Sequence, residues 1–186
     1  MTDSAFLVRH GATEWSESGR HTSSTDKPLL PAGEQLAREL RIRLDGPSYR
    51  EVLTSPLLRA RRTAELAGFE HATVVDDLLE WDYGDYEGMT TAQIRADRPD
   101  WSLWTDGCPG GETPEQVEKR VDRVVDHIRL TGGDVLIFAH GHVLRALTAR
   151  WLGLPVRDGA LFRLDTATIS QLGYERETAV IQRWNA

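Results

Sequence analysis

The sequence predicts an α/β fold, a three-layer α/β/α sandwich with a mainly parallel central sheet. Short apolar runs alternate with helical patterns through residue 152, which is typical of strand–helix–strand units with parallel strands. The run 134–140, DVLIFAH, is apolar on both faces, as expected of a strand at the centre of a parallel sheet. No repeat, low-complexity tract or linker divides the chain, so we expect one domain over residues 1–186.

The amino-terminal half alternates strands and helices. The run AFLV over 5–8 indicates a short buried strand, because Gly11 is the first residue free to turn the backbone away. Leucines at helical spacing predict a helix over 31–44, which Pro31 opens. A strand at 52–53 leads into a helix over 57–67, with Ser55 as its N-cap and Pro56 as its first residue. A third strand is expected at 73–75.

Two polar segments interrupt this pattern. Residues 14–27 are rich in Ser, Thr, Gly and His, which predicts an ordered loop beside the first strand. The acidic and aromatic segment 76–88, DDLLEWDYGDYEG, precedes a helix expected over 90–99. Trp101 and Trp104 are expected to cover part of the core or to rim a pocket.

The carboxyl-terminal half contains the strongest local signals. Thr113, Pro114 and Gln116 form a capping box with proline at the first helical position, so a helix is expected to run to about residue 130. A further helix is expected over 143–152. Strands are expected at 162–164, 169–172 and 180–184, with an antiparallel hairpin among them.

The composition limits the classes of partner. The chain has 186 residues, 40% of them hydrophobic, and a formal net charge of -7. Nucleic-acid and membrane-surface proteins gain affinity from clustered Lys and Arg, so we expect neither kind of partner. A small-molecule phosphate would have to be attracted by arginines gathered in a local pocket.

The single cysteine, Cys108, allows no intramolecular disulfide, which favours a reducing cytoplasm. The start, MTDSAFLVRH, lacks the features of a signal peptide, and no run approaches the length of a membrane span. We therefore expect a cytoplasmic protein. A homodimer is possible on general grounds, because symmetric pairs are the commonest oligomers.

Polar residues follow the two clearest strands. Arg9 and His10 stand in the stretch LVRHGATEW, where the first strand ends, and His140 follows the central strand in the same way. Ligands of open α/β sheets collect at the carboxyl ends of the strands. Arg59, in the first turn of its helix, can point toward these ends. From the residues alone, such an edge is either catalytic or a salt-bridged rim.

Four blocks resemble, in order, the motifs of the histidine phosphatase superfamily, also called the phosphoglycerate-mutase-like family. They are LVRHGATEW, LTSPLLRARRTA, LLEWDYGDYEG and IFAHGH, and they cover nearly the whole chain. Within this superfamily, three segments resemble those of bacterial acid phosphatases and, more distantly, those of sedoheptulose bisphosphatases. The segments are WSESGRHTSSTD, EWDYGDYEG and TDGCPGGE. The resemblance implies a phosphoglycerate-mutase-like fold and a metal-independent phosphomonoesterase that needs no cofactor.

The resemblance also implies a role for five residues. His10 would be the nucleophile, with one ring nitrogen attacking phosphorus and the other donating to a carbonyl. Arg9 and Arg59 would bind phosphate oxygens. His140 would donate to a phosphoryl oxygen. Glu80 would protonate the leaving alkoxide and then take a proton from the hydrolytic water.

A second set of residues is expected to bind the substrate or its phosphate. Three depart from the family pattern: Ser16 stands where Asn is frequent, Ser23 where the loop often has Gly, and His142 where the last motif often ends in Gly. The full set is Arg9, Ser16, His21, Thr22, Ser23, Arg59, Gly141 and His142. Glu87 is expected to be a surface or loop-ordering charge.

Three alternatives stay open at this point. A phosphoglycerate mutase would use the same five residues, but the short segment from Glu80 to Cys108 favours an open pocket and hydrolysis. A non-catalytic phosphate sensor on the same fold would be expected to lack one of these groups, and all are present. His140 and His142 resemble a metal-ligand pair, but no cysteine or acidic cluster nearby in the sequence completes a site.

Overall fold

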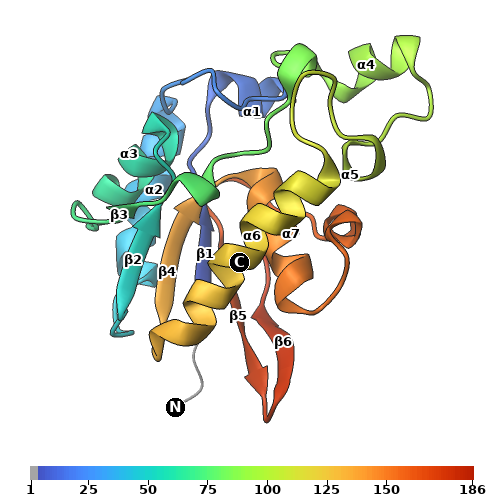
Figure 1. Cartoon of the computed structure of the whole chain (residues 1–186). Coiled ribbons are helices and arrows are strands. Elements are labelled where there is room, and N and C mark those ends of the chain that lie inside the picture. The colour runs from blue at the N-terminus through green and yellow to red at the C-terminus, as the bar shows by residue number, and fades with distance from the viewer. Residues whose placement is uncertain (1–3) are drawn as a thin grey trace.

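A six-stranded sheet lies at the centre of the computed structural model, which describes residues 4–186 (Figure 1). The strand order is β3-β2-β4-β1-β5-β6. The first four strands in this order are parallel, and β5 and β6 form an antiparallel hairpin at the β1 edge. The strands are β1 (Ala5–Arg9), β2 (Glu51–Thr54), β3 (Thr73–Val74), β4 (Val135–Ala139), β5 (Ile169–Glu175) and β6 (Thr178–Arg183).

Helices cover both faces of this sheet, as the alternation of the sequence predicts. On one face lie α2 (Pro31–Arg43) and α3 (Leu58–Leu66), and on the other α6 (Pro114–Thr131) and α7 (Gly141–Trp151) (Figure 1). Every residue of β4 is buried, because helices cover both of its faces. The α/β/α sandwich and its mainly parallel sheet are therefore confirmed.

The register of the parallel strands brings three polar residues to one edge. Arg9 of β1 is paired with Ala139 of β4, and Thr54 of β2 with Phe138 of β4. The residues that follow these strands, His10, Ser55 and His140, therefore lie side by side at the carboxyl edge.

Short helical segments gather above this edge (Figure 1). They are α1 (Glu14–Ser18), η1 (Asp76–Leu78), η2 (Gly84–Tyr86), α4 (Thr91–Asp97) and α5 (Leu103–Asp106), and η3 (Val156–Leu161) follows α7. Trp101 and Trp104, expected at the core or the pocket rim, are both buried. Among residues 4–186, no helix is long and apolar enough to cross a membrane.

Three local expectations were wrong. Residues 14–18 form α1 rather than loop, because Thr13 and Ser16 exchange side-chain and backbone hydrogen bonds in a capping box. The helix α3 begins at Leu58, and Leu57 rather than Ser55 is its N-cap.

The third error concerns residues 162–164, which form no strand. Their carbonyl groups accept hydrogen bonds from side chains instead. The carbonyl of Leu164 accepts from Arg9, and that of Arg163 accepts from the Trp184 indole.

Candidate active site

His10 lies directly after β1, and its ring is fixed by the next residue. Its backbone N–H donates to the carbonyl of Ala139 at 3.0 Å. Its Nδ1 lies 2.8 Å from the Gly11 carbonyl, which can only accept, so Nδ1 carries the proton and Nε2 keeps a free lone pair. Gly11 is required there, because a Cβ would lie 2.6 Å from the carbonyl oxygen of Gly33 in α2.

The surroundings of His10 keep its imidazole neutral. Burial is the largest cause, and the positive charges of Arg59 and Arg9 add to it, so the pKa of His10 lies well below its usual value. A neutral imidazole with a free Nε2 can act as a nucleophile. The ring is therefore prepared for nucleophilic attack even in mildly acidic solution.

His140 lies beside His10, with 5.2 Å between the ring centroids. Its Nε2 makes a 2.7 Å hydrogen bond with Ser55 Oγ. Burial, together with the charges of Arg59 and the neighbouring groups, lowers the pKa of His140 well below its usual value. Ser55 thus orients this ring across 85 residues of sequence, a role that the capping interpretation of Ser55 missed.

Two buried arginines flank the pair of histidines. The Arg59 guanidinium donates to the carbonyls of Thr22 and Ser23 through Nη2, and to that of Thr25 through Nη1. Arg9 donates to the carbonyl of Leu164. Burial lowers the pKa of both arginines, but the usual value lies so high that both remain charged.

Within the described protein, three buried side-chain nitrogens have no hydrogen-bond partner. They are Nε of Arg9, Nε of Arg59 and Nδ1 of His140. Buried polar atoms are nearly always paired, because an unpaired one costs about 1–3 kcal/mol. All three belong to residues expected to bind the phosphoryl group. A phosphate beside His10 would supply oxygens for them.

Glu80 is held at the amino terminus of α7. Its Oε1 accepts from the N–H of Val143 at 2.8 Å, and its Oε2 from the N–H of His142 at 3.0 Å. His140, the N-cap of α7, makes no side-chain capping bond, so Glu80 caps this helix from a distant part of the chain. The carboxyl group is nearly buried and faces the same cavity as His10.

A cavity of about 210 Å³ opens above His10. Eight of the residues predicted for the site line it: Arg9, His10, Ser16, His21, Thr22, Glu80, Gly141 and His142. Arg59 and His140 are fully buried and do not line it. His142 shares a 2.6 Å hydrogen bond with the Tyr83 hydroxyl, and the His21 ring packs against Tyr83.

Two of the predicted binding residues are engaged elsewhere. The Ser16 hydroxyl belongs to the capping box of α1, although the residue lines the cavity. Ser23 does not line this cavity, and its N–H donates to the Glu87 carboxylate. Glu87 also accepts from the N–H of Thr25, so it orders the loop that supplies carbonyls to Arg59.

Arg145 was missed by the sequence reasoning and lines the cavity. It lies one helical turn after His142 on α7, so helical periodicity could have found it. Its guanidinium stacks over Trp104 at 4.7 Å and donates to the carbonyls of Gly159 and Ala160. Arg20, two residues after the end of α1, also lines the cavity.

Comparison with known proteins identifies the family. The model of the histidine phosphatase superfamily (branch 1) matches residues 5–186. The chain belongs to the histidine phosphatase superfamily. In this phosphatase fold, no group of three or more His, Cys, Asp or Glu that could hold a metal ion occurs within residues 4–186.

Relatives of this histidine phosphatase fit the branch that the motifs indicate. An acid phosphatase of Mycobacterium tuberculosis is 44% identical, over 95% of this chain and 90% of its own. A sedoheptulose 1,7-bisphosphatase of Saccharomyces cerevisiae is 39% identical, over 84% of this chain and 70% of its own. The solved structure of the Mycobacterium tuberculosis open reading frame Rv3214 is 40% identical, with a TM-score of 0.93 over 98% of this chain and 97% of its own.

Proposed function

We propose that this protein hydrolyses small phosphomonoesters through a phosphohistidine formed at Nε2 of His10. The observation that carries the proposal is a neutral His10 imidazole whose neighbours Arg9, Arg59 and His140 each have a buried nitrogen without a partner. Such donors would be satisfied by the equatorial oxygens of a phosphoryl group, and they would stabilise the charge that these oxygens carry during transfer. Relatives named as phosphatases support the same chemistry.

In the first step, the Nε2 lone pair of His10 attacks phosphorus and the bond from phosphorus to the leaving oxygen breaks. Protonated Glu80 would give its proton to that oxygen, so an alcohol leaves. The Gly11 carbonyl holds the Nδ1 proton and stabilises the positive charge of the phosphorylated ring. Ser55 would donate its hydroxyl proton to Nε2 of His140, leaving the Nδ1 proton of His140 to face the phosphoryl group.

In the second step, water attacks phosphorus and gives a proton to Glu80, and the bond between phosphorus and nitrogen breaks. Inorganic phosphate leaves, and His10 is again neutral. The cavity favours small, anionic esters, because Arg20 and Arg145 add positive charge to its wall and Glu80 is its one acid among the described lining residues. We also propose a cytoplasmic location, which fits a chain whose single cysteine, Cys108, is a buried free thiol.

The test is phosphate release from p-nitrophenyl phosphate between pH 4 and 8 with a chelator present. The natural protein should turn over, and His10→Ala should lose turnover by at least about 10³-fold, since it removes the nucleophile. His71→Ala is the matched control, because His71 is exposed and does not line the cavity. Acid-labile phosphate should label the natural protein and not His10→Ala. An unlabelled but active His10→Ala variant would refute the proposal.

A further inference from the structure

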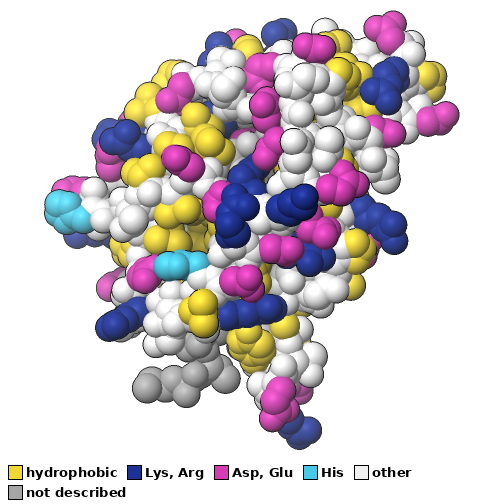
Figure 2. Space-filling model, in the orientation of Figure 1, with side chains coloured by type: hydrophobic (Ala, Val, Ile, Leu, Met, Phe, Trp, Pro, Cys, Tyr) yellow, Lys and Arg dark blue, Asp and Glu magenta, His cyan; other side chains and the backbone are white. Residues whose placement is uncertain are grey.

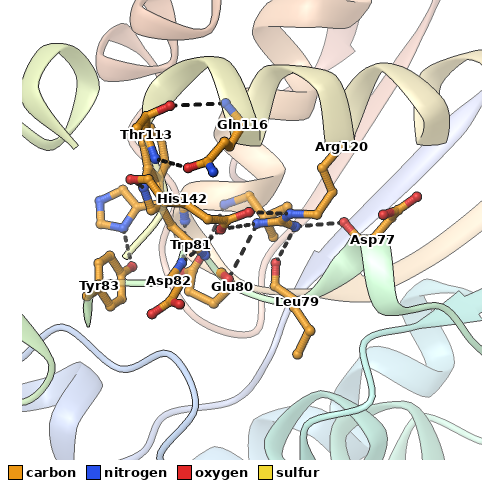
Figure 3. Close-up of polar contacts among 12 residues, drawn as sticks. Asp77, Leu79, Glu80, Trp81, Asp82, Tyr83, Thr113, Gln116, Arg120 and His142 are labelled. Atoms are coloured by element: carbon orange, nitrogen blue, oxygen red, sulfur yellow. Dashed lines mark hydrogen bonds and ion pairs between the residues drawn. The ribbon is translucent and has the colours of Figure 1, made fainter. Parts of the chain in front are cut away.

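The segment 77–82, which carries Glu80, has little regular structure of its own. It leaves η1 at Leu78 and reaches η2 at Gly84 without joining the sheet. Its carbonyl groups therefore need partners from elsewhere in the fold, and its position is set by those partners. Figure 3 shows Arg120, a residue of α6, with dashed lines to Asp77 and Leu79 of this segment.

Arg120 of α6 supplies the main contacts. Its Nη1 donates to the carbonyls of Asp77 and Leu79, each at 2.8 Å. Both carbonyls belong to residues just before Glu80 in sequence. The Arg120 side chain is only 11% exposed, so these bonds are largely shielded from competing water.

Glu112 fixes Arg120 and also binds the segment directly. Its two carboxylate oxygens accept from Nε and Nη2 of Arg120, at 2.9 and 2.7 Å, which makes a bidentate pair. Its Oε2 also accepts from the N–H of Asp82, and its carbonyl accepts from the Trp81 indole. The same residue thus holds both the guanidinium and the far side of the segment.

The Glu80 side chain is held from the opposite direction. Its carboxylate accepts from the first turn of α7, while Arg120 holds the backbone before it and Glu112 the backbone after it. If the backbone moves, the carboxyl group either leaves α7 or changes its direction toward the cavity. Hence the Arg120–Glu112 pair fixes the position from which the Glu80 side chain extends.

Arg123, a second arginine of α6, differs from Arg120 in its exposure and in its partners. Arg123, one turn further along α6, pairs with the side chain of Asp77 at the other end of the segment. Its side chain is 61% exposed and binds no carbonyl of the segment. Basic and acidic side chains are interspersed over this face of the protein (Figure 2), so exposed pairs of this kind are common here. Such pairs contribute little to position or stability.

We propose that Arg120, fixed by Glu112, is a positioning residue for Glu80 and sets its efficiency as the acid that protonates the leaving group. The inference rests on the proposed function, in which Glu80 is that acid. Arg120 touches no substrate; it acts through the backbone that leads into Glu80, and Glu112 holds the backbone that follows. The consequence is selective: esters with poor leaving groups depend on Arg120, and esters with good leaving groups do not.

The experiment measures kcat/KM for two substrates, p-nitrophenyl phosphate and glycerol 2-phosphate. This parameter covers only the steps up to cleavage of the ester, so hydrolysis of the phosphohistidine does not enter it. Nitrophenolate leaves with little help from an acid, whereas an alkoxide needs a proton. Arg120→Gln should lower kcat/KM for the glycerol ester by about 10- to 100-fold, the usual effect of a misplaced catalytic group, and for the nitrophenyl ester by less than about threefold.

Three further variants complete the test. Glu112→Gln should give the same selective loss, and it replaces Arg120→Gln if that variant fails to fold. Arg120→Lys should recover part of the loss, because an ammonium can reach a carbonyl but cannot form the bidentate pair. Arg123→Gln, the matched control from the same helix, should leave both substrates within about twofold. Thermal unfolding of each variant confirms that it is folded.

An equal fall for both substrates would overturn the inference, because a merely structural role lowers both alike. An unchanged kcat/KM for the glycerol ester would overturn it as well. These outcomes leave the proposed function intact, since the natural protein still turns over both esters. A natural protein that hydrolyses neither ester would instead refute the proposed function, and the inference with it.

Discussion

Mild acid should destabilise this protein through its buried histidines. His10 and His140 are at most 5% exposed, and their pKa values lie well below the usual 6.5, chiefly because of burial and then because of the two arginines. The unfolded chain takes up a proton at each of them as the pH falls below 6.5, whereas the folded protein does not. Stability is therefore complete above pH 6.5 and falls below it, until the folded histidines also titrate.

The size of the effect follows from the linkage relation. At pH 5.5, each histidine that stays neutral in the folded protein lowers the free energy of unfolding by up to about 1.4 kcal/mol, relative to its value well above pH 6.5. His10 and His140 together lower it by up to about 3 kcal/mol. His142 and His21, whose pKa values are also lowered chiefly by burial, add to this loss. The shifted carboxyl groups Glu34 and Asp165 have lowered pKa values and act only at lower pH. The comparison of pH 7.5 with pH 5.5 therefore isolates the histidines.

The assay is urea unfolding followed by tryptophan fluorescence at the two pH values. The natural protein should lose about 3 kcal/mol or more between them, and His140→Gln should lose about 1.4 kcal/mol less, because one neutral buried imidazole is removed. His71→Gln, a change at an exposed histidine, should behave like the natural protein. Equal stabilities at both pH values, or an unchanged loss in His140→Gln, would refute the reasoning.

Three other predictions concern single contacts. Arg59→Gln should weaken competitive inhibition by inorganic phosphate by about 10- to 100-fold, because a charged donor to the anion is lost; an unchanged inhibition constant would contradict the assigned role. Ser55→Ala should lower kcat by about tenfold with little change in KM, since it frees the His140 ring that Ser55 orients, and steady-state kinetics on the nitrophenyl ester measures this. Gly33→Ala should destabilise the fold by about 1–3 kcal/mol in urea unfolding, because the added Cβ would clash with the carbonyl oxygen of Ala12; wild-type stability would show that the α2 contact is not tight.

Features that depend on neighbours in sequence could be predicted well. The capping box of Thr113 and Gln116 forms as expected, because the two residues are three positions apart and each side chain accepts a hydrogen bond from the backbone N–H of the other residue. The equivalent box of Thr13 and Ser16 was missed, because serine is a less typical partner than Glu or Gln at that position. Ser55 also looked like a cap, but its hydroxyl is used by His140.

The sequence by itself determined the sandwich fold, the family and the placing of His10 and His140 at one sheet edge. Apolar periodicity sets the strands, and parallel strands carry their following residues to the same side. Only the tertiary structure decided that Ser55 orients His140, that Glu80 caps α7, and that Arg120 holds the segment around Glu80. These partners are 85, 63 and 41 residues apart. Periodicity in the sequence predicts which face of a helix or strand a side chain occupies. The residue that it contacts there depends on how distant segments pack in the folded protein.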